Sequence, residues 1–146
     1  MTTNVTIGTL LHHKGSQVWT IPASATVFEA VSLLAEKQIG ALPVLDGDRL
    51  IGIFSERDYA RKIVLEGRSS RTTPVRDIVS TPIVSVTSHQ TLEDAMRLMT
   101  EKRIRHLPVI DDDQMIGLVS IGDMVNWIIS AQSAAIDQMQ SYLAGR

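Results

Sequence analysis

Two short motifs in the chain pair a serine with an aspartate three residues later. They are Ser55-Glu-Arg-Asp58 and Ser120-Ile-Gly-Asp123. If a helix begins at each serine, its unpaired N–H groups and its positive end attract phosphate. The aspartate then offers two acceptor oxygens that suit the cis-diol of a ribose. The same spacing also defines a capping box, in which the two side chains only complete the first helical turn. The motifs therefore indicate either a nucleotide site or plain helix capping.

The two motifs lie in two copies of one longer sequence. A shift of 65 positions aligns residues 18–64 with residues 83–129 without a gap, and 16 pairs are identical. The leader segments Ile7-x-x-Leu10 and Val75-x-x-Ile78 correspond only at a shift of 68. The first copy therefore has three extra residues, which fall within residues 12–17. They are expected to form an exposed loop.

Each copy has the pattern strand, helix, strand, strand, helix, which predicts a mixed α/β (α+β) fold. The expected first strands are residues 18–21 and 83–86, and capping boxes at Thr26 and Thr91 open the first helices. Gly40 is expected to end the first of these helices with a positive φ. The remaining expected elements are hairpins over residues 42–54 and 107–119 and helices that start at Ser55 and Ser120.

One copy is too small to bury its own apolar faces, so two copies should pack about a pseudo-twofold axis, with clefts between them. The expected organisation is a first repeat with its leader over residues 1–65, a polar linker over 66–74, a second repeat over 75–130 and a helical tail over 131–146. The tail carries an apolar stripe. Packing of that stripe on its own module or on a second subunit both remain open.

Composition excludes several classes of protein. The 146 residues carry a net charge of −2, which gives no electrostatic reason to bind nucleic acid or an anionic membrane. The chain has no cysteine, so disulfides and thiolate zinc sites are excluded. No apolar run approaches the roughly 20 residues of a membrane span, and the N-terminus lacks the features of a signal peptide. A cytoplasmic protein is expected.

The repeat resembles a tandem pair of cystathionine-β-synthase (CBS) domains, also called a Bateman module, of the kind found as stand-alone bacterial proteins. The resemblance rests on Ile39-Gly-Ala-Leu-Pro-Val44 followed by Ser55-x-x-Asp58, and on Ile104-Arg-His-Leu-Pro-Val109 followed by Ser120-x-x-Asp123. It implies a regulatory, non-enzymatic module that forms homodimers. Such modules bind adenosine ligands between the repeats. The resemblance favours AMP and admits ADP, ATP, NAD(H) or S-adenosylmethionine.

The two copies differ in their basic residues. Arg105-His106 replaces the small pair Gly40-Ala41, and two such donors at one repeat position are best explained by an anion such as phosphate. A solvated basic patch is the alternative. Arg57 has Gly122 as its counterpart, so Arg57 could reach a phosphate held by the other repeat, and Gly122 could let a ligand approach the backbone. The site on the second repeat is therefore expected to be the better one.

The resemblance adds the remaining candidates. It implies that backbone groups at Thr20, Ile21, Ser85 and Val86 bind the edge of adenine. With six aromatic residues in the chain, aliphatic side chains rather than stacked rings are expected to hold the base. Lys14 could add a charge at the mouth of a cleft. The full set of expected ligand-binding residues is Ser85, Val86, Arg105, His106, Leu107, Ser120, Ile121, Gly122, Asp123, Thr20, Ile21, Ala41, Ser55, Arg57, Asp58 and Lys14.

No catalytic or metal motif accompanies these residues. The chain has no Gly-x-Ser-x-Gly, His-Glu-x-x-His or phosphate-loop sequence, so no enzyme is expected. The acidic run Asp111–Asp113 is expected to be a hairpin turn rather than a cation site. The leading hypothesis is an adenine-nucleotide sensor that signals to an unknown effector protein in trans. The alternatives are a ligand-free dimerisation scaffold and an unrecognised enzyme that acts on nucleotides.

Overall fold

The computed structural model describes residues 4–15, 17–79 and 81–144. The chain divides into two compact units. Unit 1 combines Met1–Gln17 with Ser85–Arg146, and unit 2 is the continuous segment Val18–Val84. Each unit holds one copy of the repeat together with the leader segment of the other copy.

Unit 2 is built on a three-stranded sheet of order β1-β2-β3. In chain order its elements are β1 (Ile21–Pro22), α2 (Val27–Lys37), β2 (Ala41–Asp46), β3 (Arg49–Ser55), α3 (Glu56–Asp58), the π-helix η2 (Tyr59–Val64) and the 3-10 helix η3 (Val75–Asp77). Strand β1 is parallel to β2, and β2 is antiparallel to β3. The leader residues Val75 and Ile78 are 0% and 1% exposed in its core.

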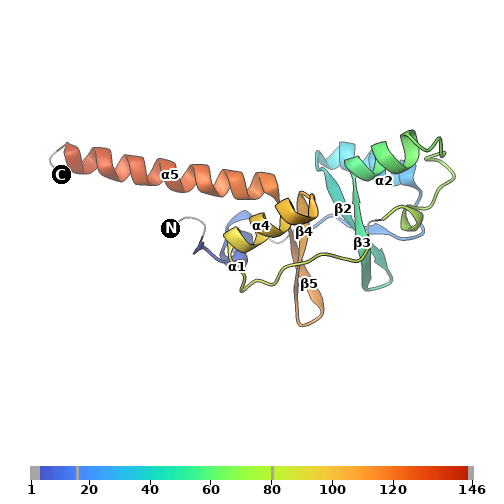
Figure 1. Ribbon diagram of the computed structural model, residues 1–146, viewed down its shortest axis with the longest axis horizontal. Coiled ribbons are helices and arrows are strands. Elements are labelled where there is room, and N and C mark those ends of the chain that lie inside the picture. The colour runs from blue at the N-terminus through green and yellow to red at the C-terminus, as the bar shows by residue number, and fades with distance from the viewer. Residues whose placement is uncertain (1–3, 16, 80, 145–146) are drawn as a thin grey trace. The chain divides into compact units, whose positions relative to one another are not determined.

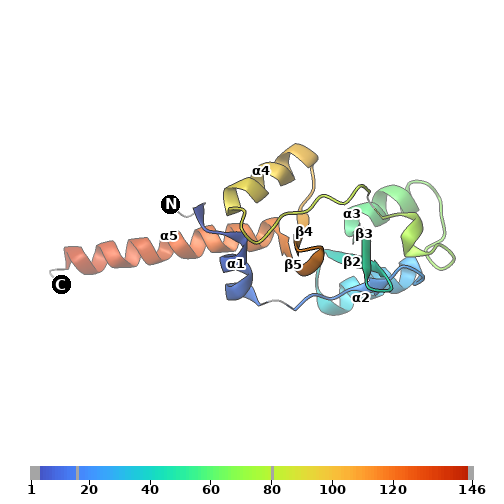
Figure 2. The ribbon, with the colours of Figure 1, turned by 90° about the horizontal axis from the view of Figure 1, so that it is seen from below.

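Unit 1 repeats this plan with a longer leader helix and a longer final helix. Its elements are α1 (Ile7–Lys14), α4 (Leu92–Lys102), β4 (His106–Asp111), β5 (Gln114–Ser120) and α5 (Ile121–Leu143), shown in Figures 1 and 2. Strands β4 and β5 form an antiparallel hairpin. Helix α1 is bound to the repeat by the amides of Ile7 and Gly8, which donate to the carbonyls of Gln90 and Ser88. The buried side chains of Ile7, Leu10 and Leu11 give α1 its apolar face.

The hairpins and helix starts agree with the sequence predictions. Asp112 and Asp113 form the turn between β4 and β5 with φ angles of 50° and 63°, so the acidic run is a hairpin turn, as expected. Thr26 and Thr91 cap α2 and α4. A complete capping box also needs a bond from the amide of the cap residue to the carboxylate three residues later. Thr91 and Asp94 make this bond. The Glu29 carboxylate instead accepts from the Thr26 hydroxyl, so Thr26 caps α2 without a complete box.

Three local predictions were wrong. The expected strands over 18–21 and 83–86 shrink to Ile21–Pro22 and a single bridge at Val86. Gly40 does not have a positive φ; Gln38 ends α2 in the left-handed conformation instead, with φ 55°. The segment expected as a loop after residue 11 continues α1 to Lys14. Ser16 of that segment lies outside the described residues.

Among the described residues, no helix is both long and apolar enough to cross a membrane.

Candidate functional site

The first turn of α5 carries the second Ser-x-x-Asp motif as a complete capping box. The Ser120 hydroxyl accepts a hydrogen bond from the Asp123 amide at 3.1 Å, and Oδ2 of Asp123 accepts one from the Ser120 amide at 2.8 Å. The first motif does the same at α3, where Ser55 and Asp58 form the box. Capping, one of the two interpretations of the motif, is therefore present in both copies. The nucleotide interpretation depends on whether each aspartate keeps an acceptor oxygen, and each helix start an amide donor, that capping does not use.

The start of α5 keeps both an acceptor and a donor available. All hydrogen bonds of the Asp123 side chain go to Oδ2, so Oδ1 accepts none within the described residues. The Ile121 amide donates to the Arg105 carbonyl and the Asp123 amide to Ser120, whereas the exposed Gly122 amide has no acceptor in the described part of the chain. A Cβ at Gly122 would meet only the Ser120 hydroxyl, at 3.6 Å. A ligand can therefore approach this helix start closely.

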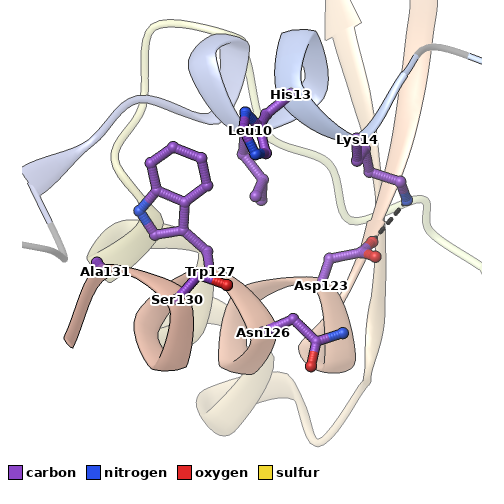
Figure 3. A pocket seen from close by; sticks show the side chains of 8 residues that line it. All are labelled: Leu10, His13, Lys14, Asp123, Asn126, Trp127, Ser130 and Ala131. Carbon is purple, nitrogen blue, oxygen red and sulfur yellow. Dashed lines mark hydrogen bonds and ion pairs between the residues drawn. The ribbon is translucent and has the colours of Figure 1, made fainter. Parts of the chain in front are cut away.

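Lys14, at the last position of α1, reaches the same aspartate. Its ammonium donates to Oδ2 of Asp123 at 2.6 Å and to the Leu118 carbonyl at 2.9 Å. The side chains of Lys14 and Asp123 are 33% and 23% exposed, so the ion pair lies at the surface rather than in the core. The leader helix thus adds a positive charge to the motif of the second repeat (Figure 3), and the exposed fractions show that solvent reaches both partners.

Arg105 and His106 border the same helix start. His106 is the first residue of β4 and pairs with Ser120 at the end of β5. Burial lowers the pKa of the His106 imidazole below 6.5; the Asp123 carboxylate raises it, and the positive charges of Lys14 and Arg105 lower it further. His106 is therefore neutral near pH 7. The structure brings one carboxylate, two fixed cations and one imidazole together around the start of α5.

Two further candidates of unit 1, Val86 and Leu107, lie deeper. Val86 bridges in parallel to Val109 of β4, and the backbone of Val86 is fully used, since its amide donates to Pro108 and its carbonyl accepts from Ile110. Val86 and Leu107 are 1% and 0% exposed, so their side chains belong to the core. Ser85 precedes the bridge, and Ile121 is partly exposed. Aliphatic side chains are expected to contact the base. Of Val86, Leu107 and Ile121, only Ile121 is exposed enough to do so.

Unit 2 gathers the second set of candidates, Thr20, Ile21, Ala41, Ser55, Arg57 and Asp58. Asp58 is only 8% exposed. Its Oδ2 accepts from the amide and the hydroxyl of Ser55, and its Oδ1 lies 3.5 Å from the Lys62 ammonium. Both oxygens are therefore engaged. Asp58 is less able than Asp123 to accept hydrogen bonds from a ligand.

The sixteen candidates thus fall into two groups, ten in unit 1 and six in unit 2. Ligand binding between the two repeats stays a prediction. The cluster of Lys14, Arg105, His106 and Asp123 lies entirely within unit 1.

A pocket beside Asp123 was not predicted from the sequence. The pocket has a volume of about 360 Å³ and lies between α1 and α5 (Figure 3). His13 of α1 meets the ring of Trp127 edge-on, with centroids 5.3 Å apart. Trp127 stands four residues after Asp123, one turn further along the same face of α5. The spacing of Asp123 and Trp127 shows that both lie on one face of α5. It could indicate a pocket only if residues 12–14 were known to be helical and to pack against that face. The lining residues are Leu10, His13, Lys14, Asp123, Asn126, Trp127, Ser130 and Ala131.

No group of three or more histidine, cysteine, aspartate or glutamate side chains within the described ranges is placed to hold a metal ion.

The family model described as "CBS domain" matches residues 1–65 and 75–130. The chain belongs to the CBS-domain family. A curated relative, CBS domain-containing protein CBSX3, mitochondrial, from Arabidopsis thaliana, is 40% identical over 136 residues, which cover 90% of this chain and 66% of that relative. The chain therefore spans just under two thirds of that protein's length.

Solved structures of CBS proteins share the fold. A CBS-domain protein of Burkholderia ambifaria is 45% identical with a TM-score of 0.84, over 87% of this chain and 96% of that one. The CBS domain pair of protein MJ0100, in complex with 5-methylthioadenosine and S-adenosyl-L-methionine, is 20% identical with a TM-score of 0.76. It covers 86% of this chain and 97% of its own.

Proposed function

We propose that this CBS-domain pair is a regulatory adenine-nucleotide sensor with its principal binding residues in unit 1. The observation that carries the proposal is the cluster of Lys14, Arg105, His106 and Asp123 around the start of α5. AMP, ADP, ATP and NAD(H) are the expected ligands, and AMP is favoured. The MJ0100 pair supports an adenosine-containing ligand, because it was solved with two such compounds.

The cluster supplies what the two polar parts of a nucleotide need. A phosphate accepts hydrogen bonds, and the Gly122 amide, the Arg105 guanidinium and the His106 imidazole can all donate to it. A ribose cis-diol donates hydrogen bonds, and Oδ1 of Asp123 is the open acceptor beside those donors. The residues at Ser85 and Ile121 would then border the base. A sulfonium ligand such as S-adenosylmethionine fits this set less well, because three of its four charged or titratable groups are basic.

Lys14 gives the proposed site two arrangements. In the free protein its ammonium pairs with Asp123 at 2.6 Å. A surface ion pair of this kind contributes about 0–1 kcal/mol, so a ligand can open it at small cost. Once ribose hydroxyls bind the carboxylate, the ammonium is free to turn toward the phosphate. Binding would thereby change the attachment of α1 to the second repeat, which is a local change that another protein can sense.

The chain acts by binding rather than by catalysis, as a homodimer in the cytoplasm, and it regulates an effector protein in trans.

A ligand panel tests the proposal. The full chain is titrated by calorimetry and thermal shift with AMP, ADP, ATP, NADH and S-adenosylmethionine, and with GMP as the control for the base. A ligand at about 100 times its dissociation constant adds about 2.7 kcal/mol to the free energy of unfolding. Adenosine compounds are expected to stabilise the protein and GMP is not.

The absence of any response to all five adenosine compounds at millimolar concentration would overturn the proposal. Chromatography of the incubated ligands provides the second readout. Turnover of a nucleotide would instead support an enzyme.

A further inference from the structure

Helix α5 runs far beyond the module that it belongs to. Within unit 1, its first half lies beside α1 and α4, and its second half extends past both (Figures 1 and 2). Ala131 is the last residue that lines the pocket with α1, and every residue from 132 to 143 is exposed. An isolated helix of about 12 residues is only marginally stable in water. Because the helix nevertheless continues to Leu143, a partner that covers it would account for its stability.

The exposed apolar residues of α5 follow a heptad repeat. With Ile129 at position a, the a positions are Ile129, Ile136 and Leu143, and the d positions are Val125, Gln132 and Met139. The five apolar members are between 43% and 75% exposed. Met124, Trp127 and Ala131 face the module from positions c and f, on the other side of the helix. We call the a and d positions from Val125 to Leu143 the α5 seam. It is an apolar stripe that the module itself does not cover.

The residues that flank the seam favour a second copy of the same helix. The e positions are Asn126, Ser133 and Gln140, and the g positions are Ile128, Ala135 and Tyr142, so none carries a charge. Between Asp123 and the end of α5 at Leu143, the one charged residue is Asp137, at position b, which points away from the seam. Two identical helices can therefore approach without repulsion. Flanking charges, which specify unlike partners in coiled coils, are missing from this sequence.

We propose that the α5 seam pairs with the seam of a second copy of this chain as a parallel two-helix coiled coil. Gln132 decides the direction. In a parallel pair each d residue faces its own copy, so the two Gln132 amides can bond to each other. In an antiparallel pair that is centred on the seam, Gln132 would face Ile136 of the other copy and its amide would be buried without a partner. Because the seam is short, the dimer is expected to dissociate on dilution.

Disulfide trapping tests the contact and its direction, and the chain is suited to it because it has no cysteine. Met139→Cys places a thiol at a d position that meets its own copy only in a parallel pair. Ala134→Cys places one at the f position of the same helix, away from the seam. Under mild oxidation, full-length Met139→Cys is expected to form covalent dimers about tenfold faster or more than Ala134→Cys, since the thiols of a formed pair are at high effective concentration.

A charge substitution provides the readout in solution. Ile136→Lys places an ammonium inside the seam, and Ala134→Lys places the same charge outside it. Sedimentation of the full chain is expected to show a dissociation constant about tenfold or more weaker for Ile136→Lys than for Ala134→Lys. Circular dichroism of both variants reports whether the modules are folded.

Equal trapping rates for the two cysteine variants, with equal dissociation constants for the two lysine variants, would overturn the proposal. That result would also follow if the seam bound another protein or folded back on its own module. Fast trapping of Met139→Cys remains informative even if the CBS repeats form a separate dimer contact, because it reports only on the seam.

Discussion

The Lys14 ammonium lies 2.6 Å from Oδ2 of Asp123, a residue 109 positions later in the chain. Lys14 comes from the leader of the first repeat, and Asp123 from the motif of the second. The ion pair therefore joins the leader helix to the residue that we expect to hold a ribose. Unit 2 has a similar pair, in which Lys62 lies 3.5 Å from Oδ1 of Asp58 and also donates to the Ile78 carbonyl. Because Lys62 pairs with the motif aspartate of the other repeat, its replacement can serve as the control for the replacement of Lys14.

Replacement of Lys14 should change the affinities for adenosine and for ATP in different ways. In Lys14→Met, Asp123 loses its competitor and the phosphate loses a cation. Adenosine, which has no phosphate, should bind at least as tightly as to the wild type. ATP should bind about tenfold more weakly, because a charge-assisted hydrogen bond is lost. The measurement is the ratio of the two dissociation constants by calorimetry. Lys62→Met should leave the ratio unchanged, and an equal change of both affinities in Lys14→Met would refute the role given to Lys14.

The two motif aspartates should differ in their effect on ligand binding. Asp123→Asn keeps an oxygen for the capping bond to the Ser120 amide but removes the charge that a ribose would meet. The variant is expected to weaken AMP binding about ten- to hundredfold. Asp58→Asn should weaken it less, because Asp58 is 8% exposed and both of its oxygens are already engaged. Calorimetry at one pH compares the two. A larger loss in Asp58→Asn would move the principal site to unit 2.

The repeat, the hairpins and the helix caps could be predicted because they depend on short-range patterns. A threonine or serine that caps a helix needs only the residue three positions later, and a turn at Asp112 and Asp113 needs only its own backbone. The internal copy then gave a second, independent example of each element. For this reason the start of α5 at Ser120 was correctly predicted from residues alone.

The contacts of α1 could not be predicted in the same way. Sequence alignment assigns the leader Ile7-x-x-Leu10 to the first repeat, whereas the structure packs it in unit 1 with the second. The partner of Lys14 is therefore far away in the sequence, and no local pattern indicates it. Because the leader of the first repeat packs on the second repeat, His13 meets Trp127, and the pocket between α1 and α5 could not be predicted either.

The packing of α1 on the second repeat can be tested at Gly117 of β5. A Cβ at this position would lie 2.7 Å from Cδ2 of Leu11, whose side chain is buried. Gly117→Ala should therefore lower the free energy of unfolding by about 1–3 kcal/mol, the usual effect of overpacking. Gly122→Ala is the matched control, since its Cβ meets only the Ser120 hydroxyl at 3.6 Å. Urea titrations measure both. If Gly117→Ala is as stable as Gly122→Ala, Leu11 is not held where the structure places it.

The stability of the ligand-free protein should depend on pH through His106. Burial lowers the pKa of the folded imidazole below the 6.5 of an unperturbed histidine, so the unfolded chain binds more protons as the pH falls below that value. The contribution of His106 to stability is therefore complete above about pH 6.5 and is lost as the pH falls through the lowered pKa. Urea titrations from about pH 8 to about pH 5.5 should show a decline that is smaller in His106→Gln, because glutamine does not titrate. A bound phosphate would favour the imidazolium and should raise this pKa, so AMP is expected to reduce the decline in the wild type more than in His106→Gln. Identical pH profiles for the two proteins, with and without AMP, would show that His106 neither titrates in this range nor meets the phosphate.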